Sequence, residues 1–534
     1  MRRPFWLFAG FGLTLWVTIC GQAPSAHGQG SSAAGPGAES RAERAYDAAV
    51  KRGPLSLRAF LEQFPKGADL HVHLSGAVYA ETLIRDAAED GACVDPVALS
   101  LAPPPCTGNL IPAKNFSGNI DRQTQLLYDK LIDSLSVRSF VPTDRWSEHD
   151  QFFAVFDRTG GLKDHSGEWV DEVASRAAEQ NQQYLELMVT PPFSRAAGIA
   201  SALGWSPQLA QADPRALAQF RQQLLDKGLR DEVAADHEEV SAAEAQRKQL
   251  EHCGTAQKAP ACDVEVRYIW QVLRDFPPEQ VFAQTLLGFE TVEASIKAKD
   301  DTWVGINFVR PEDDYVAMRD YTLQMKMVGF LHALYPEVHI SLHAGELVLG
   351  LVPPEGLRFH IRQAVELAHA ERIGHGVDVM HEDDAAALLK ELAAKHVMVE
   401  INLSSNEAIL SVKGAEHPFP LYRAAHVPVA LSTDDEGVSR IDLTHEYVRA
   451  ALDYHLSYAD LKQLARTGME HDFLPGASLW LRPDDFSAPV DACKGQALGS
   501  ERPSPECKAF LDQSEKAWAQ WELERKFRAF EARF

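Results

Sequence analysis

The stretch Asp69-Leu70-His71-Val72-His73-Leu74 is a short apolar run that carries two histidines two residues apart. In an extended strand, residues at this spacing lie on the same face. The run is the first of eight, and amphipathic helical stretches separate them. The other seven runs span 184–189, 264–272, 303–309, 339–342, 372–374, 398–403 and 427–431. Eight such alternations predict an α/β fold, a closed parallel (β/α)8 TIM-type barrel.

The barrel is expected to occupy residues 66–480, with additions around it. Two intervals between predicted strands, about 87–120 and 192–263, are too long for simple crossovers. Each contains one pair of cysteines, so we interpret them as helical, disulfide-stapled insertions. Residues 29–65 then form an N-terminal extension and residues 481–534 a C-terminal helical extension.

Residues 1–28 have a basic start, an apolar run over 5–19, and then small and polar residues. This pattern predicts a secretory signal peptide that is cleaved after Gly28. Cys20 offers a lipid anchor as the alternative, although Ile19 is a poor residue directly before a modified cysteine. No later stretch has 18 consecutive apolar residues, so no membrane span is expected. The mature protein is predicted to be exported, into the periplasm or the extracellular space.

Six cysteines follow the leader, and they fall into three pairs that are close in sequence. Export favours disulfides over free thiols. Metal binding, the alternative, would need Cys-x-x-Cys spacing or nearby histidine clusters, and neither occurs. The predicted bridges are Cys93–Cys106, Cys253–Cys262 and Cys493–Cys507.

The composition excludes several classes of partner. Hydrophobic residues make up 45% and charged residues 24% of the 534, which is ordinary globular usage. The net charge is −24, and no basic patch interrupts it. A nucleic-acid or anionic-membrane binder would need such a patch against this field. A small substrate, neutral or weakly charged, is therefore favoured.

Polar residues follow several of the predicted strands. His343 comes directly after 339–342 and His375 directly after 372–374, and Asp434-Asp435 follow 427–431 with Ser432-Thr433 between. Taken singly, each has an ordinary explanation as a turn residue or a helix cap. Together with the histidine pair on the first strand they mark four strand ends, where barrel enzymes build active sites. Three imidazoles and one carboxylate can hold one Zn²⁺ per chain with a position left for water, although Fe, Co or Ni also fit such a set.

Glu346 lies three residues after His343. It could be an ordinary acid in the first turn of a helix. A carboxyl kept protonated beside a metal site can instead give its proton to a ring nitrogen of a substrate. Such a site would hydrolyse a polarised C–N centre. Ser405-Asn406, after the seventh strand, is interpreted as mainly structural.

At this point the sequence resembles the adenosine deaminase family, within the metal-dependent amidohydrolase barrels. Export, the insertions and the stretch 148–153 make it most similar to the secreted, growth-factor-related branch of that family. The stretches that match run in family order between residue 66 and about residue 480: 66–74, 343–346, 372–377, 400–406 and 432–435.

The resemblance implies a role for each of these residues. His375 would be the base that positions the attacking water, and Glu346 the acid that protonates purine N1. Asp435 would hydrogen-bond the purine and fix its orientation. The implied reaction is hydrolytic deamination of adenosine and 2′-deoxyadenosine, which are small purine nucleosides, to inosine and 2′-deoxyinosine with release of ammonia. The implied zinc ligands are His71, His73, His343 and Asp434.

Two candidate substrate-binding positions depart from the family pattern. Ser75 stands where the family often has an aspartate that contacts the ribose, although its hydroxyl can still bond a sugar. Arg310 stands where a glycine usually donates its backbone N–H to the purine. Arginine keeps that N–H, but its side chain could crowd the pocket or attract a phosphate.

The sequence motifs also bear on three alternative functions. A different one-metal amidohydrolase or an AMP-type deaminase is the nearest enzyme alternative, whereas two-metal relatives would need a lysine within 303–309, and none is there. The other zinc deaminase signature, His-x-Glu with Pro-Cys-x-x-Cys, is absent. A secreted binding or signalling factor that had lost catalysis would lack a ligand or the acid, and none is missing. The sequence leaves the oligomeric state open, a homodimer included.

Overall fold

The structure is a computed structural model that describes residues 37–300 and 302–534. The predicted signal peptide and Cys20 lie outside the described residues. Within them, eight parallel strands form one sheet in the order β1-β5-β6-β7-β8-β9-β10-β11. The strands are β1 (Gly67–His73), β5 (Gln182–Val189), β6 (Glu265–Leu273), β7 (Trp303–Val309), β8 (His339–Ala344), β9 (Arg372–His375), β10 (Met398–Ile401) and β11 (Val429–Leu431).

The sheet closes on itself just after its last strand. A parallel bridge joins Val72 of β1 to Asp434, and the Asp434 N–H donates to the His71 carbonyl at 2.8 Å. The predicted (β/α)8 TIM-type barrel is therefore confirmed. Strand ends differ by a few residues from the prediction. In particular, β8 runs to Ala344, so His343 lies within the strand instead of after it.

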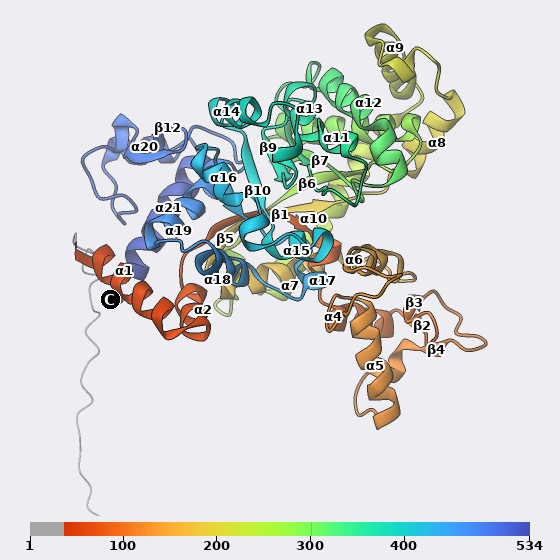
Figure 1. The fold of residues 1–534 in the computed structure, drawn as a ribbon, viewed down its shortest axis with the longest axis horizontal. Helices are drawn as coiled ribbons and strands as arrows, with labels where there is room; N and C mark the ends of the chain where they lie inside the picture. The colour runs from red at the N-terminus through yellow and green to blue at the C-terminus, as the bar shows by residue number, and fades with distance from the viewer. Residues whose placement is uncertain (1–36, 301) are drawn as a thin grey trace, which may run out of the picture.

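Helices cover the outside of the barrel (Figure 1). Because both faces of each strand are covered, β1 and β7 are buried at every residue, as parallel sheets require. The covering helices that precede or follow the strands are α7 (Ser166–Glu179), α11 (Pro278–Ala298), α12 (Tyr315–His332), α13 (His360–Glu366), α14 (Ala385–Lys395), α16 (Phe419–Ala424), α18 (Leu443–Asp453) and α19 (Tyr458–Glu470).

The chain between β1 and α7 projects from the barrel as an arm (Figure 1). It has its own small apolar core, which includes Leu83, Val94 and Leu131. The Cys93–Cys106 disulfide links two of its segments. Its elements are α3 (Leu74–Ala77), α4 (Ala80–Glu89), the antiparallel strands β2 (Cys93–Asp95), β3 (Ser100–Ala102) and β4 (Ile111–Pro112), α5 (Arg122–Ser134) and α6 (Glu148–Asp157).

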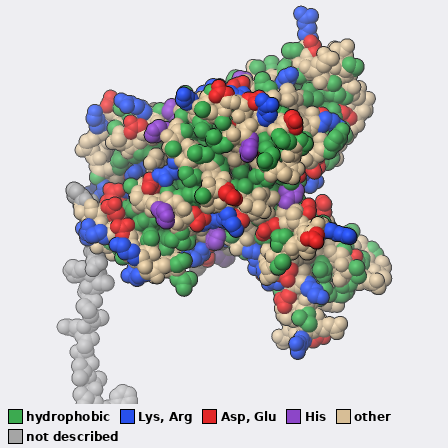
Figure 2. Space-filling model, viewed as in Figure 1, with side chains coloured by type: hydrophobic (Ala, Val, Ile, Leu, Met, Phe, Trp, Pro, Cys, Tyr) green, Lys and Arg blue, Asp and Glu red, His purple; other side chains and the backbone are tan. Residues whose placement is uncertain are grey.

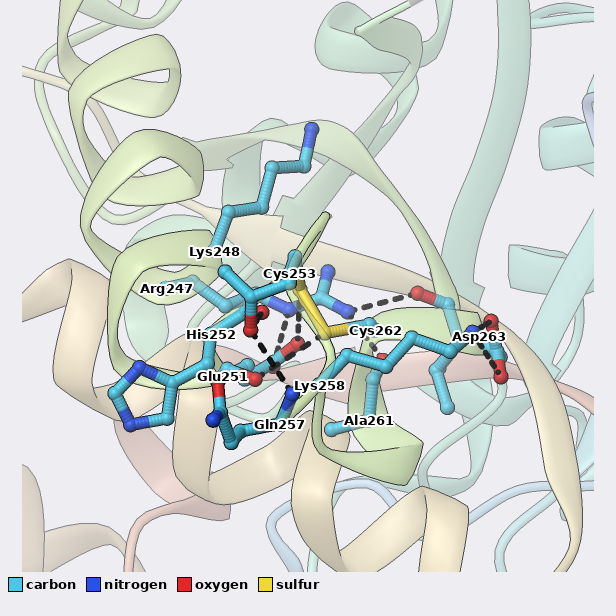
Figure 3. The surroundings of a disulfide bond; sticks show 12 residues. Arg247, Lys248, Glu251, His252, Cys253, Gln257, Lys258, Ala261, Cys262 and Asp263 are labelled. Carbon is cyan, nitrogen blue, oxygen red and sulfur yellow. Dashed lines mark hydrogen bonds and ion pairs between the residues drawn. A yellow bond between two sulfur atoms is a disulfide. The ribbon is translucent and has the colours of Figure 1, made fainter.

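The second long interval, between β5 and β6, is helical. It contains α8 (Ser194–Leu203), α9 (Pro214–Asp226) and α10 (Val233–Leu250). The Cys253–Cys262 disulfide closes the loop that leads from α10 to β6 (Figure 3). Beneath it, the buried Arg247 pairs with Glu251 at 2.7 Å and donates to the carbonyls of Ala261 and Val264 at 2.8 Å each. The Arg247 guanidinium thus holds the backbone that leads into β6 through hydrogen bonds, in addition to the disulfide.

The two ends of the described chain meet on one side of the barrel. Helices α1 (Gly37–Arg52) and α2 (Pro54–Glu62) pack near α21 (Glu515–Glu531), where Phe64 contacts Phe527 and Phe530 with ring centroids 5.6 and 5.9 Å apart. The third predicted disulfide, Cys493–Cys507, lies beside α20 (Pro505–Leu511) and the hairpin of β12 (Trp480–Arg482) and β13 (Asp485–Pro489).

The surface mixes charges of both signs. On the face drawn in Figure 2, lysine and arginine side chains are scattered among acidic ones and form no continuous basic area. Among the described residues, no helix combines the length and the apolar character that a membrane span needs.

Candidate active site

A cavity of about 690 Å³ opens at the carboxyl end of the barrel strands. Its floor includes His73, His343, Glu346, Asp434 and Asp435, which come from β1, β8 and the loops after β8 and β11. One wall is formed by α6 of the arm, which contributes its aromatic side chains. The structure therefore brings the residues predicted from separate strand ends into one pocket, the usual place for a barrel active site.

Three imidazoles converge at the bottom of this pocket. His343 Nε2 lies 3.1 Å from His71 Nε2 and 3.2 Å from His73 Nε2. Asp434 Oδ1 lies 3.2 Å from His73 Nε2 and 3.7 Å from His71 Nε2. All four side chains are buried, and their donor atoms lie within 4.8 Å of one another.

The other nitrogen of each ring has a fixed acceptor. His71 Nδ1 lies 2.6 Å from Glu400 Oε2, and His73 Nδ1 lies 2.8 Å from Gln271 Oε1. His343 Nδ1 lies 2.8 Å from Asn307 Oδ1, which also accepts the His343 backbone N–H at 3.2 Å. Because these partners accept, each Nδ1 carries a proton, and the three Nε2 atoms turn towards one another.

The donor set fits a bound cation. Contacts of 3.1 and 3.2 Å between unprotonated nitrogens repel unless positive charge lies among them. Burial lowers the pKa of His73, but the charges of Asp435 and Asp434 outweigh it and raise that pKa to about 9, so without a cation this ring takes up a proton that a bound metal ion would displace. Burial and the neighbouring histidines hold the pKa of His343 well below its usual range, so this ring is neutral and ready to ligate. An N₃O set of this kind suits Zn²⁺ and leaves a position for water.

Glu346 lies at the edge of the donor set. Its side chain is buried, and its Oε1 lies 3.4 Å from His375 Nδ1. Burial, followed by the charges of Asp434 and Glu312, raises the pKa of Glu346 well above its usual range. A carboxyl that stays protonated at neutral pH can donate a proton, which is what the predicted acid requires.

His375 is held by a chain of hydrogen bonds that starts from a backbone donor. The Phe419 N–H donates to His417 Nδ1, so His417 Nε2 donates to Asn406 Oδ1 at 2.9 Å. Asn406 Nδ2 then donates to His375 Nδ1 at 2.8 Å. The neutral His375 ring therefore carries its proton on Nε2, 3.7 Å from Asp434 Oδ2. This tautomer can orient an attacking oxygen, whereas accepting a proton at Nε2 would need the other tautomer.

The predicted substrate contacts also line the pocket. Asp435 is buried, and a side chain at Gly76 would place a Cβ 1.5 Å from its Oδ1, so glycine is required there. Ser75 and Arg310 lie on the pocket wall. Arg310 has φ of +86°, a left-handed conformation that glycine adopts without strain. Arg310 thus adopts a backbone conformation that suits glycine, the residue that the family resemblance leads us to expect at this position.

The sequence interpretation missed the residues that orient the ligands. Gln271 and Asn307 are ordinary amides inside strands, and nothing in their spacing marks them. Register pairs them across β6 and β7, so both lie under the imidazoles. Asn406, interpreted as mainly structural, contacts His375 directly. Glu400 lies in a stretch that carries the family resemblance, which was the only available signal for it.

The barrel, its buried His₃Asp set and the adjacent carboxyl of raised pKa are features that a metal-dependent hydrolase of the barrel type requires. A sequence model described as adenosine deaminase matches residues 143–478, well over half of the chain. The chain belongs to the adenosine deaminase family. The resemblance to the secreted branch stays a prediction.

Individual relatives match over shorter stretches. An adenosine deaminase of Clostridium perfringens is 31% identical over 168 residues, 31% of this chain and 43% of the relative. One of Shewanella loihica is 39% identical over 113 residues, 21% of this chain and 33% of the relative. The chain thus matches less than half the length of these curated relatives.

Solved structures match more of the chain at lower identity. The N6-methyl-AMP deaminase from Arabidopsis thaliana is 20% identical, covers 78% of this chain and 94% of its own, and has a TM-score of 0.47. An amidohydrolase from Burkholderia ambifaria with bound Zn is 16% identical, covers 78% and 88%, and has a TM-score of 0.47.

Proposed function

We propose that this protein hydrolytically deaminates adenosine and 2′-deoxyadenosine, giving inosine and 2′-deoxyinosine and releasing ammonia, with one Zn²⁺ per chain. One observation carries the proposal. Three Nε2 lone pairs and the Asp434 carboxylate converge on one point, and the protonated Glu346 lies beside it. That combination supplies both a nucleophile and a proton for C–N hydrolysis.

The chain's own residues divide the chemistry. His71, His73, His343 and Asp434 would hold the ion, which supplies a water of lowered pKa when bound. Glu346 would give its proton to purine N1 and make C6 electrophilic. His375 would orient the attacking oxygen through its Nε2–H, and Asp435 would hydrogen-bond the purine. Each of these acceptor and donor groups is buried, so bulk water does not compete with the substrate for them.

The charges at the pocket mouth favour a nucleoside over AMP. Arg310 Nε lies 3.4 Å from Asp275 Oδ2, and His149 Nε2 lies 3.1 Å from Asp313 Oδ1. Both of these basic side chains therefore already face carboxylates, and Asp314 adds a further acidic group to the lining. A 5′-phosphate would have to compete with Asp275 for Arg310. It would also be repelled by the other carboxylates at the mouth, those of Asp313 and Asp314. The acidic mouth suits a neutral sugar better.

AMP remains the second candidate because Arg310 lines the pocket and could form a fork on a phosphate once Asp275 gives way. The export predicted from the leader is part of the proposal. It is supported by the three disulfides, which are rare in cytosolic proteins, and an exported enzyme would meet nucleosides after phosphatases have acted.

The test is ammonia release from adenosine, 2′-deoxyadenosine, adenine and AMP, with metal-stripped and zinc-restored protein. We expect zinc-dependent turnover of the two nucleosides, far faster than that of AMP. A kcat/KM for AMP equal to or above that for adenosine, lost on Arg310→Ala, would reverse the ranking and make Arg310 the phosphate anchor. No ammonia from any of the four by zinc-restored protein would overturn the proposed function.

A further inference from the structure

Glu312 is a buried carboxylate to which neither the sequence pattern nor the proposed chemistry gives a role. It lies in the loop after β7, and 1% of its surface is exposed. Its neighbours in sequence, Arg310 and Pro311, line the pocket mouth, whereas Glu312 itself points inward. A fully buried carboxylate is costly unless several donors satisfy it.

Three donors satisfy Glu312, and two of them belong to the segment that carries the predicted acid. The Gly345 N–H donates to Oε1 at 3.0 Å, and the Glu346 N–H donates to Oε2 at 2.8 Å. His360 Nδ1 donates to Oε1 at 2.5 Å. Hydrogen bonds to an ionised acceptor are among the strongest in proteins. This carboxylate therefore holds two consecutive backbone amides of the segment Gly345–Glu346, which we call the acid loop.

His360 is itself held in place, so Glu312 has a rigid support. The His360 ring stacks on Tyr321 with centroids 3.7 Å apart and planes 11° from parallel. The Tyr321 hydroxyl donates to the His360 carbonyl at 2.9 Å. Both side chains are buried. The carboxylate is therefore anchored from α12 and α13, outside the ligand set.

The acid loop needs such an anchor because its backbone leaves the strand abruptly. β8 ends at Ala344, and Gly345 has φ of +76°, where a Cβ would lie 2.4 Å from Asp378 Oδ1. From the other side, the N–H groups of Val377 and Asp378 donate to the Gly345 carbonyl at 2.8 and 3.1 Å. These bonds use the carbonyl of Gly345. The N–H groups of Gly345 and Glu346 donate to Glu312 instead.

We propose that Glu312, supported by His360, is a positioning residue that fixes the main chain of Gly345 and Glu346 and so sets where the Glu346 carboxyl points. The inference rests on the proposed function. A displacement of about 1 Å in a reacting group can cost about 10²-fold in rate. A small shift of the Glu346 carboxyl on loss of Glu312 would therefore lower kcat. Glu312 belongs neither to the donor set nor to the pocket lining.

Glu312→Gln is the test, since an amide keeps the shape but offers one acceptor where the carboxylate offers two. We expect kcat for adenosine to fall by at least about 10-fold, with KM and zinc content unchanged. The decisive measurement is the double variant with Glu346→Gln. If Glu312 acts through Glu346, its substitution adds no further loss in that background. A loss that multiplies in the double variant, or zinc lost from Glu312→Gln, would overturn the proposal.

Glu312→Asp keeps the charge but shortens the side chain and so moves the carboxylate away from the two amides. It tests the same point if Glu312→Gln does not fold. We expect a smaller loss of kcat, and no further loss when Glu312→Asp is combined with Glu346→Gln. Glu232→Gln is the matched control. Glu232 also accepts two consecutive amides, those of Arg195 and Ala196 at 3.1 and 2.8 Å, but none of these residues lines the pocket. Its substitution should leave kcat unchanged.

Amide hydrogen exchange separates this inference from the proposed function. We expect the Gly345 and Glu346 amides to be protected in the wild-type protein and to exchange faster in Glu312→Gln, whether or not adenosine is a substrate. Equal exchange in the two proteins would overturn the positioning role even in an active deaminase.

Discussion

The two ends of the barrel each have a large cavity lined with histidines and carboxylates, and the two differ in how those groups are paired. The cavity at the amino ends of the strands, about 750 Å³, is slightly larger than the one of about 690 Å³ at the carboxyl ends. In the amino-end cavity three of the four lining histidines have a carboxylate partner, whereas His369 lies against the ring of His332. His339 pairs with Glu371 at 2.9 Å, and His396 and His471 both pair with Asp484 at 2.8 Å.

At the carboxyl end the pairing is different. The Nδ1 atoms take the acceptors, and the Nε2 atoms are left to face one another across 3.1 and 3.2 Å. Cavity size and residue composition thus do not distinguish a site from a crevice here. The distinguishing feature is three ring nitrogens that converge on one point beside the Asp434 carboxylate, an arrangement that suits a bound cation.

The largest expected effect comes from breaking that convergence. His71→Ala should remove most of the bound zinc and abolish deamination, because the remaining donors cannot close the set. His471→Ala, at the amino end, removes an equally well-paired imidazole and should leave zinc and turnover unchanged. Elemental analysis and ammonia release on both folded variants make the comparison. Full zinc occupancy in an inactive His71→Ala protein would contradict the ligand assignment.

The second-largest effect is expected from removing the acidic proton of Glu346 while the metal ligands stay in place. Glu346→Gln keeps the shape of the acid but has no proton to give, so kcat should fall by at least about 10² while zinc is retained. Glu371→Gln at the amino end is the counterpart and should leave kcat as it is. Near-normal turnover in Glu346→Gln would mean that another group supplies the proton.

The smallest effects are in the dependence of stability on pH, and the two ends should show opposite signs. At the carboxyl end, burial would raise the pKa of Glu312, but the His360 hydrogen bond and charge and the other donors lower it from 4.5 to about 2. Its stabilising contribution is present above about pH 4.5 and is lost as the pH falls from there to about 2.

At the amino end, burial raises the pKa of Asp472 from 3.8 to about 7, despite Lys516 nearby. Folding then favours its protonated form, so this contribution is present below pH 3.8 and is lost as the pH rises to about 7. Each contribution is on the order of a few kcal/mol. Denaturant unfolding against pH should show the acid-side slope weakened in Glu312→Gln and the neutral-side slope weakened in Asp472→Asn. Unchanged slopes would contradict these assignments.

The barrel and its ligands were accessible from sequence because both leave local marks. Alternating runs mark strands, and histidines and acids are conspicuous at strand ends. The residues that orient the ligands depend on which strand lies beside which and in what register, as for Gln271 and Asn307 across β6 and β7. That information is not local. Glu312 was missed for the same reason, because its partners lie 33 and 34 residues away in sequence.

The arm illustrates a different limit. Its insertion was placed at about 87–120 on the evidence of cysteines and prolines, yet the projecting chain continues through α5 and α6 to the pocket wall. Helical periodicity in α5 and α6 is the same as that of any barrel helix. Nothing in the sequence says that α6 turns its aromatic side chains towards the site.

The closure of the barrel between its first and last strands also bears on how the chain matures. Thr433 Oγ1 donates to Asp69 Oδ2 at 2.8 Å across 364 residues of sequence, directly beside Asp434 and His71. During synthesis, the first-strand ligands leave the ribosome hundreds of residues before Asp434 does. A nascent chain therefore holds an incomplete donor set until the final strand docks, so tight binding of the proposed zinc would occur only once folding is complete. An ion bound across this seam would in turn resist the first step by which the barrel could open.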